Sequence, residues 1–290
     1  MRTVAPGVLT RRRFLTFLAA GGAACLGAGR APGAAETPPD AKPAFRFGVL
    51  ADVQYADIAA QGKRQYRESL LKLEHAVTEL NKLKPDFVIQ LGDFINGGFA
   101  NFDPVLAAYA KLTVPAYHVL GNHDFAVEAD KRGKVLAKLG LDKLGGGQGY
   151  YDFARAGWRL VVLNGMEGKE AVPPQQLKWL KETLAKAAAA GEPTIVFCHF
   201  PVYPCSGPGS GLNLKNAAEV VVALESAKGV VAYFCGHEHQ GGYAQKSRIH
   251  FLTLKGLVEA DPTAYALIEV FPDCLKVTGF GREPSRTLNM

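Results

Sequence analysis

Short apolar runs alternate with segments of helical periodicity along most of the chain. Leucine and valine recur about every 3.6 residues at 70–80 and again at 177–184, directly after Pro173 and Pro174, and this spacing predicts helices. Alternating strands and helices are typical of βαβ units built around buried sheets. The apolar runs predict strands at 45–51, 87–91, 116–120, 160–163, 194–198 and 230–235.

The C-terminal part has a different pattern. From residue 249 onward the strand-like runs IHFLTL, ALIEVF and CLKVTGF follow one another without helical spacers. We therefore expect antiparallel strands that complete a sheet. We expect one α/β domain at 45–282 and a C-terminal tail at 283–290, which agrees with 290 residues and a hydrophobic content of 48%.

The N-terminus has the pattern of an export signal. Arg11, Arg12 and Arg13 directly precede Phe14 and an apolar stretch that is too short and too rich in glycine for a membrane span. The pattern resembles a twin-arginine signal peptide at 1–35, followed by a linker at 36–44. The small residues around Cys25 leave a lipoprotein-like alternative. We expect the twin-arginine translocase to export the chain to the periplasm or the extracellular space, without a transmembrane segment in the mature protein.

The signal peptide changes the interpretation of the charge. Its removal takes away five arginines and no acid, which lowers the formal net charge from +6 to +1. The basic pI is thus a property of the signal, and nucleic-acid binding is not indicated for the mature chain. The five cysteines form no C-x-x-C pair, so neither a redox motif nor a cysteine zinc site is supported, and a disulfide stays open.

Polar side chains able to bind metals follow five of the predicted strands at the point where each strand ends. In open α/β sheets, ligands bind in the crevice outside the carboxyl ends of the strands. We therefore expect these side chains to meet at one place. They are Asp52 and Gln54, Asp93, Asn122, His199, and His237 with His239.

This set has the chemistry of a dinuclear metal centre. Two carboxylates, two carboxamides and three imidazoles suffice for two divalent ions if one carboxylate bridges them, and Asp93 is our choice for the bridge. Mixed oxygen and nitrogen ligands suit manganese, iron, zinc, cobalt or nickel. Paired ions about 3.5 to 4 Å apart are an arrangement that clamps a phosphoryl group.

The same stretches carry a family resemblance. D-x-Q, G-D, G-N-H-D, a lone strand-end histidine and G-H-x-H, in this order, resemble the calcineurin-like metallophosphoesterases. The resemblance covers 45–282 and implies a four-layer α-β-β-α sandwich. The stretches FGVLADVQYAD, LGNHD and GHEHQGGY are similar to the subgroup of manganese-dependent ADP-ribose/CDP-alcohol diphosphatases.

The resemblance implies a distribution of ligands between two divalent ions, with manganese expected. A water or hydroxide bridging the ions would attack phosphorus. The first ion would be held by Asp52, Gln54, Asp93 and His239, and the second by Asp93, Asn122, His199 and His237.

His123 is not needed for either ligand set, and we expect it to protonate the leaving oxygen. Many relatives have an aspartate paired with this histidine, whereas the corresponding residue here is Asn96. An asparagine can orient the imidazole by accepting a hydrogen bond, but it cannot stabilise the protonated ring with a full charge.

Basic and aromatic residues after the first motif are candidates for substrate binding. We expect Lys63, Arg64 and Arg67 to open the first helix and one or more of them to reach a phosphate, with Arg64 favoured for its forked guanidinium group. We expect Tyr55 to stack on a base or sugar. The alternatives are a solvated basic helix face and an aromatic ring that serves only in packing.

The leading hypothesis is an exported, metal-dependent hydrolase of phosphodiester or diphosphate bonds in small phosphorylated molecules such as ADP-ribose or CDP-alcohols. The first alternative is an exported phosphomonoesterase of the same fold. The second is a binding protein without catalytic activity. Product analysis separates them, because only the leading hypothesis predicts cleavage between two phosphates.

Overall fold

The computed structural model describes residues 42–203 and 212–290. The predicted signal peptide and its cleavage site, most of the linker, Cys25 and Cys205 lie outside the described residues. Within the described ranges, no helix is both long enough and apolar enough to span a membrane.

The first sheet has six strands in the order β12-β11-β10-β1-β2-β3. Its parallel half consists of β1 (Phe45–Leu50), β2 (Phe87–Gln90) and β3 (Ala116–His118). Its antiparallel half consists of β10 (Ala264–Val270), β11 (Cys274–Gly281) and β12 (Arg286–Asn289). The prediction of antiparallel strands is confirmed for ALIEVF and CLKVTGF, which form β10 and β11. It is wrong for IHFLTL, which lies in the second sheet and runs parallel to one of its neighbours there. Residues 283–290, expected to form a tail, include β12.

The second sheet also has six strands, in the order β4-β5-β6-β7-β9-β8. Four central strands are parallel, namely β5 (Trp158–Val162), β6 (Thr194–Phe197), β7 (Val230–Cys235) and β9 (Ile249–Thr253). The edge strands β4 (Tyr151–Arg155) and β8 (Gly242–Lys246) are antiparallel to their neighbours. The sequence did not predict these two edges, whose residues are partly polar and only half-buried.

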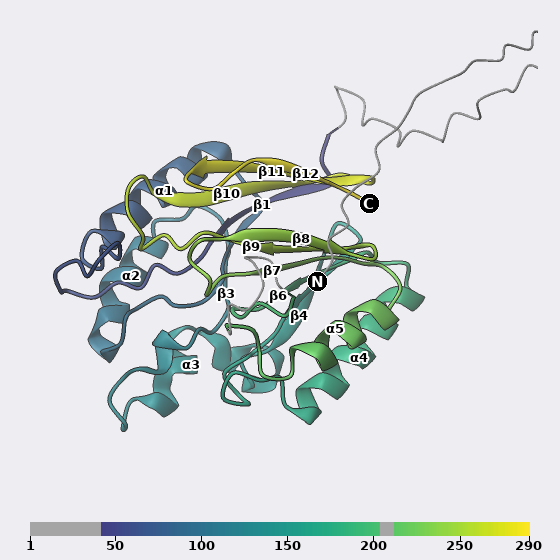
Figure 1. The fold of residues 1–290 in the computed structure, drawn as a ribbon, viewed down its shortest axis with the longest axis horizontal. Coiled ribbons are helices and arrows are strands. Elements are labelled where there is room, and N and C mark those ends of the chain that lie inside the picture. Colours follow the sequence, from purple (N-terminus) through teal and green to yellow (C-terminus); the bar gives the residue numbers. More distant parts are fainter. Residues whose placement is uncertain (1–41, 204–211) are drawn as a thin grey trace, which may run out of the picture. The chain divides into compact units, whose positions relative to one another are not determined.

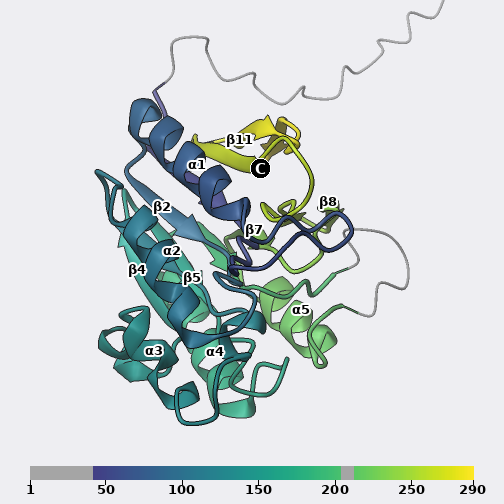
Figure 2. The same ribbon diagram turned by 90° about the vertical axis from the view of Figure 1, so that its left-hand side faces the viewer.

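Helices cover the outer faces of both sheets (Figures 1 and 2). The first sheet is covered by α1 (Ser69–Leu83) and α2 (Phe102–Tyr109), and the second by α4 (Pro174–Ala189) and α5 (Ala217–Ser226). The α-β-β-α order confirms the expected fold class. The connections also contain α3 (Val135–Lys138) and the 3₁₀ turns η1 (Phe99–Asn101), η2 (His123–Phe125), η3 (Arg132–Lys134), η4 (Leu141–Lys143) and η5 (Gly145–Gly147).

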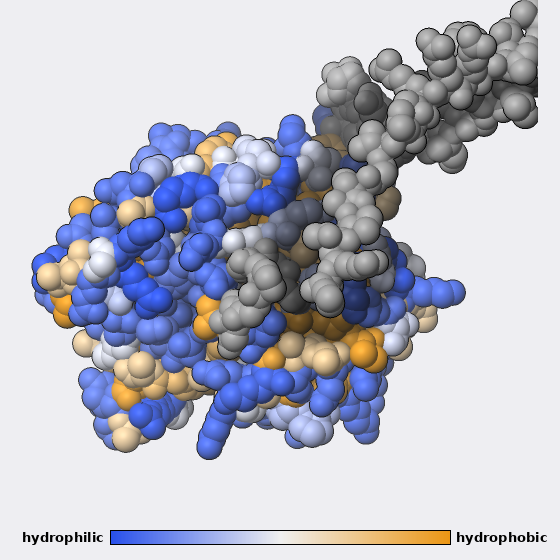
Figure 3. All heavy atoms as spheres, viewed as in Figure 1, coloured by the Kyte–Doolittle hydropathy of each residue, from blue (hydrophilic) through white to orange (hydrophobic). Residues whose placement is uncertain are grey.

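Apolar side chains fill the space between the sheets. The ring of Phe47 on β1 lies edge-on to Phe197 on β6 and Phe234 on β7, with centroids 5.8 and 6.0 Å apart. On β6, Phe197 joins this inner core, whereas the next residue, Cys198, packs with the residues under α4 and α5. Strands buried on both faces explain the continuous apolar runs of the sequence. The face shown in Figure 3 is mainly hydrophilic.

The first helix begins later than expected. Lys63, Arg64 and Arg67 precede it, because residues 61–64 form a turn in which the backbones of Gln61 and Arg64 bond each other at 2.9 and 3.0 Å. The helix starts at Ser69. The prediction that the three basic residues open the helix is wrong, and they lie in the connection from the first strand.

Candidate metal centre

The loops after the parallel strands of both sheets meet at one edge. The backbone N–H of Asp52 donates to Gly92 O at 3.1 Å and that of Gln54 donates to Asp93 O at 2.9 Å, which joins the loops after β1 and β2. Across the two sheets, the backbone N–H of His237 donates to the Asp52 carboxylate at 3.0 Å. Short strands in fixed register thus bring together residues far apart in the sequence.

Four of the predicted ligands have a left-handed backbone. The φ angles are 54° at Asp52, 43° at Gln54, 58° at Asp93 and 67° at His237. Such a conformation costs an L residue about 1 to 3 kcal/mol and persists only where the surrounding structure imposes it. Strain of this kind concentrates at functional sites, and here it aims side chains away from the sheets toward one point.

The first group of side chains lies around His199. Its Nε2 is 3.1 Å from Asn122 Oδ1, 3.1 Å from His237 Nδ1 and 3.4 Å from Asp93 Oδ2. Its Nδ1 donates to the carbonyl of Leu91 at 2.8 Å, which leaves Nε2 facing the group. Ligand atoms of Asp93, His199 and His237 all lie within 4.8 Å of one another. One cation fits among them.

The second group lies on the other side of Asp93. Gln54 Nε2 donates to Asp93 Oδ2 at 2.8 Å, and Gln54 Oε1 is buried without a hydrogen-bond partner among the described residues. His239 Nε2 is 3.5 Å from Asp52 Oδ1, and its Nδ1 bonds Glu259 Oε1 at 2.8 Å. The same oxygen of Asp93 therefore faces both groups, which is the position a bridging carboxylate would occupy.

The pKa values of two candidate ligands in the cluster shift in opposite directions. Burial lowers the pKa of His199, but the Asp93 carboxylate outweighs burial and raises it to about 9. Burial together with the charge of His199 lowers the pKa of His237 to about 4. Buried ligand nitrogens and carboxylate oxygens that face one another, with an unpaired amide oxygen beside them, are the environment that a divalent cation stabilises. The donor set fits two such ions.

Two glycines allow the loops to approach the carboxylates. A Cβ atom at Gly121 would lie 2.2 Å from Asp93 Oδ1, and one at Gly236 would lie 2.6 Å from Asp52 Oδ2. Real Cβ atoms do not tolerate such distances, so larger residues here would displace the candidate ligands. These positions explain why glycine precedes Asn122 and His237 in the motifs.

Asp124 holds the loops in place rather than facing the ligand cluster. It is fully buried and accepts backbone hydrogen bonds from Phe94 at 2.7 Å, Gly121 at 2.9 Å and Asp93 at 3.1 Å. A carboxylate that accepts three N–H groups fixes the relative positions of the loops after β2 and β3.

His123 lies beside the cluster. Its backbone N–H donates to Asp93 Oδ1 at 2.8 Å, and burial lowers the pKa of the ring, partly offset by the charge of Asp93. Asn96 donates its backbone N–H to Tyr55 O at 2.9 Å. The described residues show no hydrogen bond between the side chains of Asn96 and His123, so their pairing stays a prediction.

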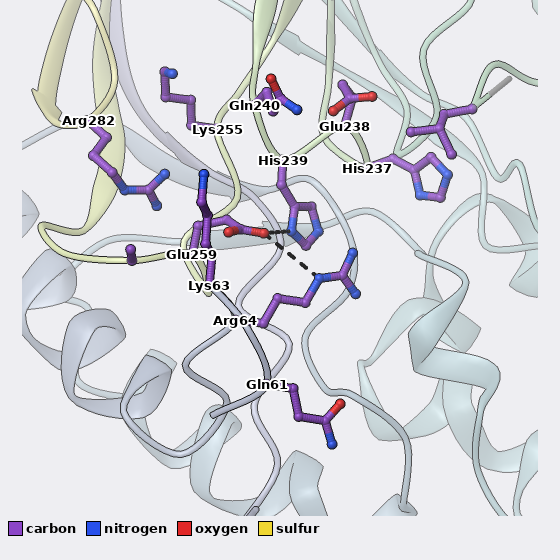
Figure 4. Close-up of a pocket in the computed structure, with 12 residues that line it drawn as sticks. Gln61, Lys63, Arg64, His237, Glu238, His239, Gln240, Lys255, Glu259 and Arg282 are labelled. Carbon is purple, nitrogen blue, oxygen red and sulfur yellow. Dashed lines mark hydrogen bonds and ion pairs between the residues drawn. The ribbon is translucent and has the colours of Figure 1, made fainter. Parts of the chain in front are cut away.

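A cavity of about 700 Å³ opens beside His237 and His239 (Figure 4). Arg64 lines it, as we expected for a phosphate ligand. Arg67 does not line it and pairs with Asp57. The backbone of Tyr55 forms a β-bridge with Ile95, and its side chain packs against the hydrophobic core. The described lining residues are Gln61, Lys63, Arg64, Leu212, His237, Glu238, His239, Gln240, Lys255, Glu259, Ala260 and Arg282.

The sequence analysis did not identify three charged residues of this cavity. Glu259 bonds the candidate ligand His239 at 2.8 Å and lies 3.8 Å from Arg64, as the dashed lines of Figure 4 show. Lys255 comes from the same loop, and Arg282 follows β11. None of them belongs to a motif, and only the folded chain brings them to His239.

The comparison with protein families gives a match over most of the described chain. The family described as Calcineurin-like phosphoesterase matches residues 45–241. This range contains all seven candidate ligands and His123, while Glu259 and Arg282 lie beyond it.

Individual relatives match nearly their whole length. A manganese-dependent ADP-ribose/CDP-alcohol diphosphatase from Mus musculus is 28% identical, over 87% of this chain and 96% of the relative. The protein with the same description from Oryza sativa subsp. japonica is 31% identical, over 82% of this chain and 92% of the relative. Among solved structures, a dimetal phosphatase from Danio rerio has a TM-score of 0.75 at 25% identity, over 86% of this chain and 99% of that one.

Proposed function

Because the chain belongs to the calcineurin-like phosphoesterase family, we propose that it cleaves the diphosphate linkage of small nucleoside diphosphate esters. The descriptions of its relatives, which name ADP-ribose and CDP-alcohols, support this class of substrate. Hydrolysis of ADP-ribose would add water across the bond between the two phosphates and give AMP and ribose 5-phosphate.

The chain is a metal-dependent phosphoric ester or diphosphate hydrolase, as its family and relatives establish. We propose manganese as the metal, on the descriptions of the relatives. When bound, two such ions activate water and neutralise charge on the phosphoryl oxygens. One ion would be held by Asp52, Gln54, Asp93 and His239, and the other by Asp93, Asn122, His199 and His237.

The protein's own side chains would supply proton transfer and binding. His123 is held against Asp93 through its backbone, so its ring can protonate the leaving oxygen at the edge of the cluster. Arg64 lines the cavity beside His239 and would bind phosphate oxygens with its guanidinium group. Arg67 pairs with Asp57 outside the cavity lining, so we place the phosphate contact at Arg64.

The observation that carries the proposal is the convergence of oxygen and nitrogen ligands on both sides of Asp93 Oδ2. The test is product analysis with manganese-loaded protein, using ADP-ribose, CDP-choline and p-nitrophenyl phosphate. We expect AMP from ADP-ribose and CMP from CDP-choline. Release of inorganic phosphate from the monoester alone would favour the phosphomonoesterase instead.

We also propose that the twin-arginine route exports the protein to the periplasm or the extracellular space. The proposal is supported by Arg11, Arg12 and Arg13 directly before Phe14 and Leu15. Replacing Arg12 and Arg13 by lysine should leave a cytoplasmic precursor, whereas the unaltered chain should lose its N-terminal residues on export. Equal export of both forms would contradict this route.

A further inference from the structure

The cavity beside His237 and His239 carries an excess of positive charge. It is lined by four cationic side chains and two carboxylates. Figure 4 shows Lys63, Lys255 and Arg282 on the Glu259 side of His239, away from His237. A phosphoryl group bound at the candidate metal cluster would therefore have a basic region to one side.

Among the described residues, two of the four cations have neither a carboxylate nor a carbonyl partner for their charged group. Arg64 is 3.8 Å from Glu259, and Arg282 donates to the carbonyls of Gly256 and Pro262 at 2.6 and 2.8 Å, so its guanidinium group anchors the loop before β10. By contrast, the ammonium groups of Lys63 and Lys255 have neither a carboxylate within ion-pair distance nor a hydrogen-bonded carbonyl in residues 42–203 and 212–290. Their ammonium groups are available to an anionic ligand.

The position of Lys255 is fixed from two sides. Its backbone N–H donates at 2.9 Å to Glu283, a buried carboxylate. On the other side, a Cβ atom at Gly241 would lie 2.7 Å from Lys255 Cγ, and Gly241 has a φ of 68°. This glycine belongs to the G-G-Y stretch that follows the last histidine motif. The glycine leaves room for the lysine stem at the edge of the cavity.

We propose that Lys63 and Lys255, together with Arg64, form a second anion subsite for a phosphate that does not react. This inference rests on the proposed function, because a diphosphate ester has one phosphate to place at the metal cluster and another to place among the basic residues. A simple monoester or diester has no group for the subsite. The subsite would thus select diphosphate esters over substrates with a single phosphorus.

The kinetic test replaces each lysine by methionine, which keeps an unbranched side chain one atom shorter and removes the charge. The variants Lys63→Met and Lys255→Met are compared with Lys228→Met, an exposed lysine outside the cavity lining. We expect the ratio of kcat/KM for ADP-ribose to that for bis(p-nitrophenyl) phosphate to fall about tenfold in each cavity variant, the loss of one charged hydrogen bond. The Lys228 variant should keep the ratio of the unaltered enzyme. An unchanged ratio in both cavity variants would overturn the inference.

A binding measurement tests the subsite independently of which substrate the enzyme cleaves. Calorimetry of manganese-loaded protein with α,β-methylene ADP and with AMP compares the same nucleoside with and without the second phosphorus group. The diphosphate analogue should bind more tightly than AMP, and this preference should shrink about tenfold in Lys255→Met. If ADP-ribose is not cleaved but this preference is found, the proposed function fails and the subsite stands. Equal affinity for the two nucleotides would refute the subsite whatever the enzyme cleaves.

Discussion

Glu259 should control the affinity of one metal site but not of the other. Its Oε1 is 2.8 Å from His239 Nδ1, and its side chain is only 17% exposed. Carboxylates that hold a metal-binding histidine fix the ring orientation and raise the basicity of the ligand nitrogen. The perturbation is Glu259→Gln, which keeps the shape of the side chain but removes its charge.

The size of the expected loss in manganese affinity follows from the contact between Glu259 and His239. A hydrogen bond to a charged partner contributes about 1.5 to 3 kcal/mol, which corresponds to roughly 10- to 100-fold in binding. Only the group containing His239 contacts Glu259, while the group around His199 is held by Leu91 O. We therefore expect the dissociation constant of one of two manganese ions to rise by about that factor, with the other unchanged.

The assay is a titration of metal-free protein with manganese, with free Mn²⁺ followed by electron paramagnetic resonance. Glu182→Gln is the matched control, because Glu182 is an exposed residue whose partner Lys178 lies 4.0 Å away on the same helix. It should bind manganese like the unaltered protein. The reasoning is refuted if Glu259→Gln binds both ions with unaltered affinity, or if it weakens both equally.

Three other substitutions test separate parts of the account. His123→Asn should retain both metals while kcat falls about 10²- to 10⁴-fold, less for esters with good leaving groups; loss of metal would contradict the general-acid role. Asn96→Asp should raise the pH above which activity falls, because a neighbouring carboxylate raises the pKa of His123 and keeps the ring protonated. An unchanged pH-rate profile would refute the pairing. Phe47→Ala, at a fully buried ring, should cost about 3 to 5 kcal/mol in the free energy of unfolding, measured by urea denaturation, and a loss below about 1 kcal/mol would contradict the packing.

The sequence predicted the central strands because their burial on both faces leaves continuous apolar runs. On β6, for example, alternate residues belong to different cores and all are apolar after Thr194. The edge strands β4 and β8 were not predicted, because they are not buried on both faces and so leave no continuous apolar run. Their polar, half-buried residues have no run or clear alternation that distinguishes them from loops.

The candidate ligands could be predicted because each follows a strand directly, and parallel strands bring their ends to one edge. The cavity could not be predicted in the same way. Glu259 reaches His239 because Leu257 and Val258 donate backbone hydrogen bonds to Ala51 O and Asp52 O, both at 2.9 Å. No local pattern encodes that contact between distant loops.

The basic residues after the first motif show the same limit. Arg64 and Arg67 both carry a guanidinium group able to bind phosphate, and of the two only Arg64 lines the cavity. The turn at 61–64 sets the direction of Arg64, while Asp57 engages Arg67 on the surface. Which of two similar side chains faces a site is a property of the folded loop.

The central claim is that two cations share Asp93. Anomalous diffraction at the manganese edge, from crystals grown with manganese, tests it directly. The account predicts two peaks about 3.5 to 4 Å apart, both bonded to the Asp93 carboxylate. A single peak at saturating manganese, or two peaks of which only one is bonded to Asp93, would contradict it.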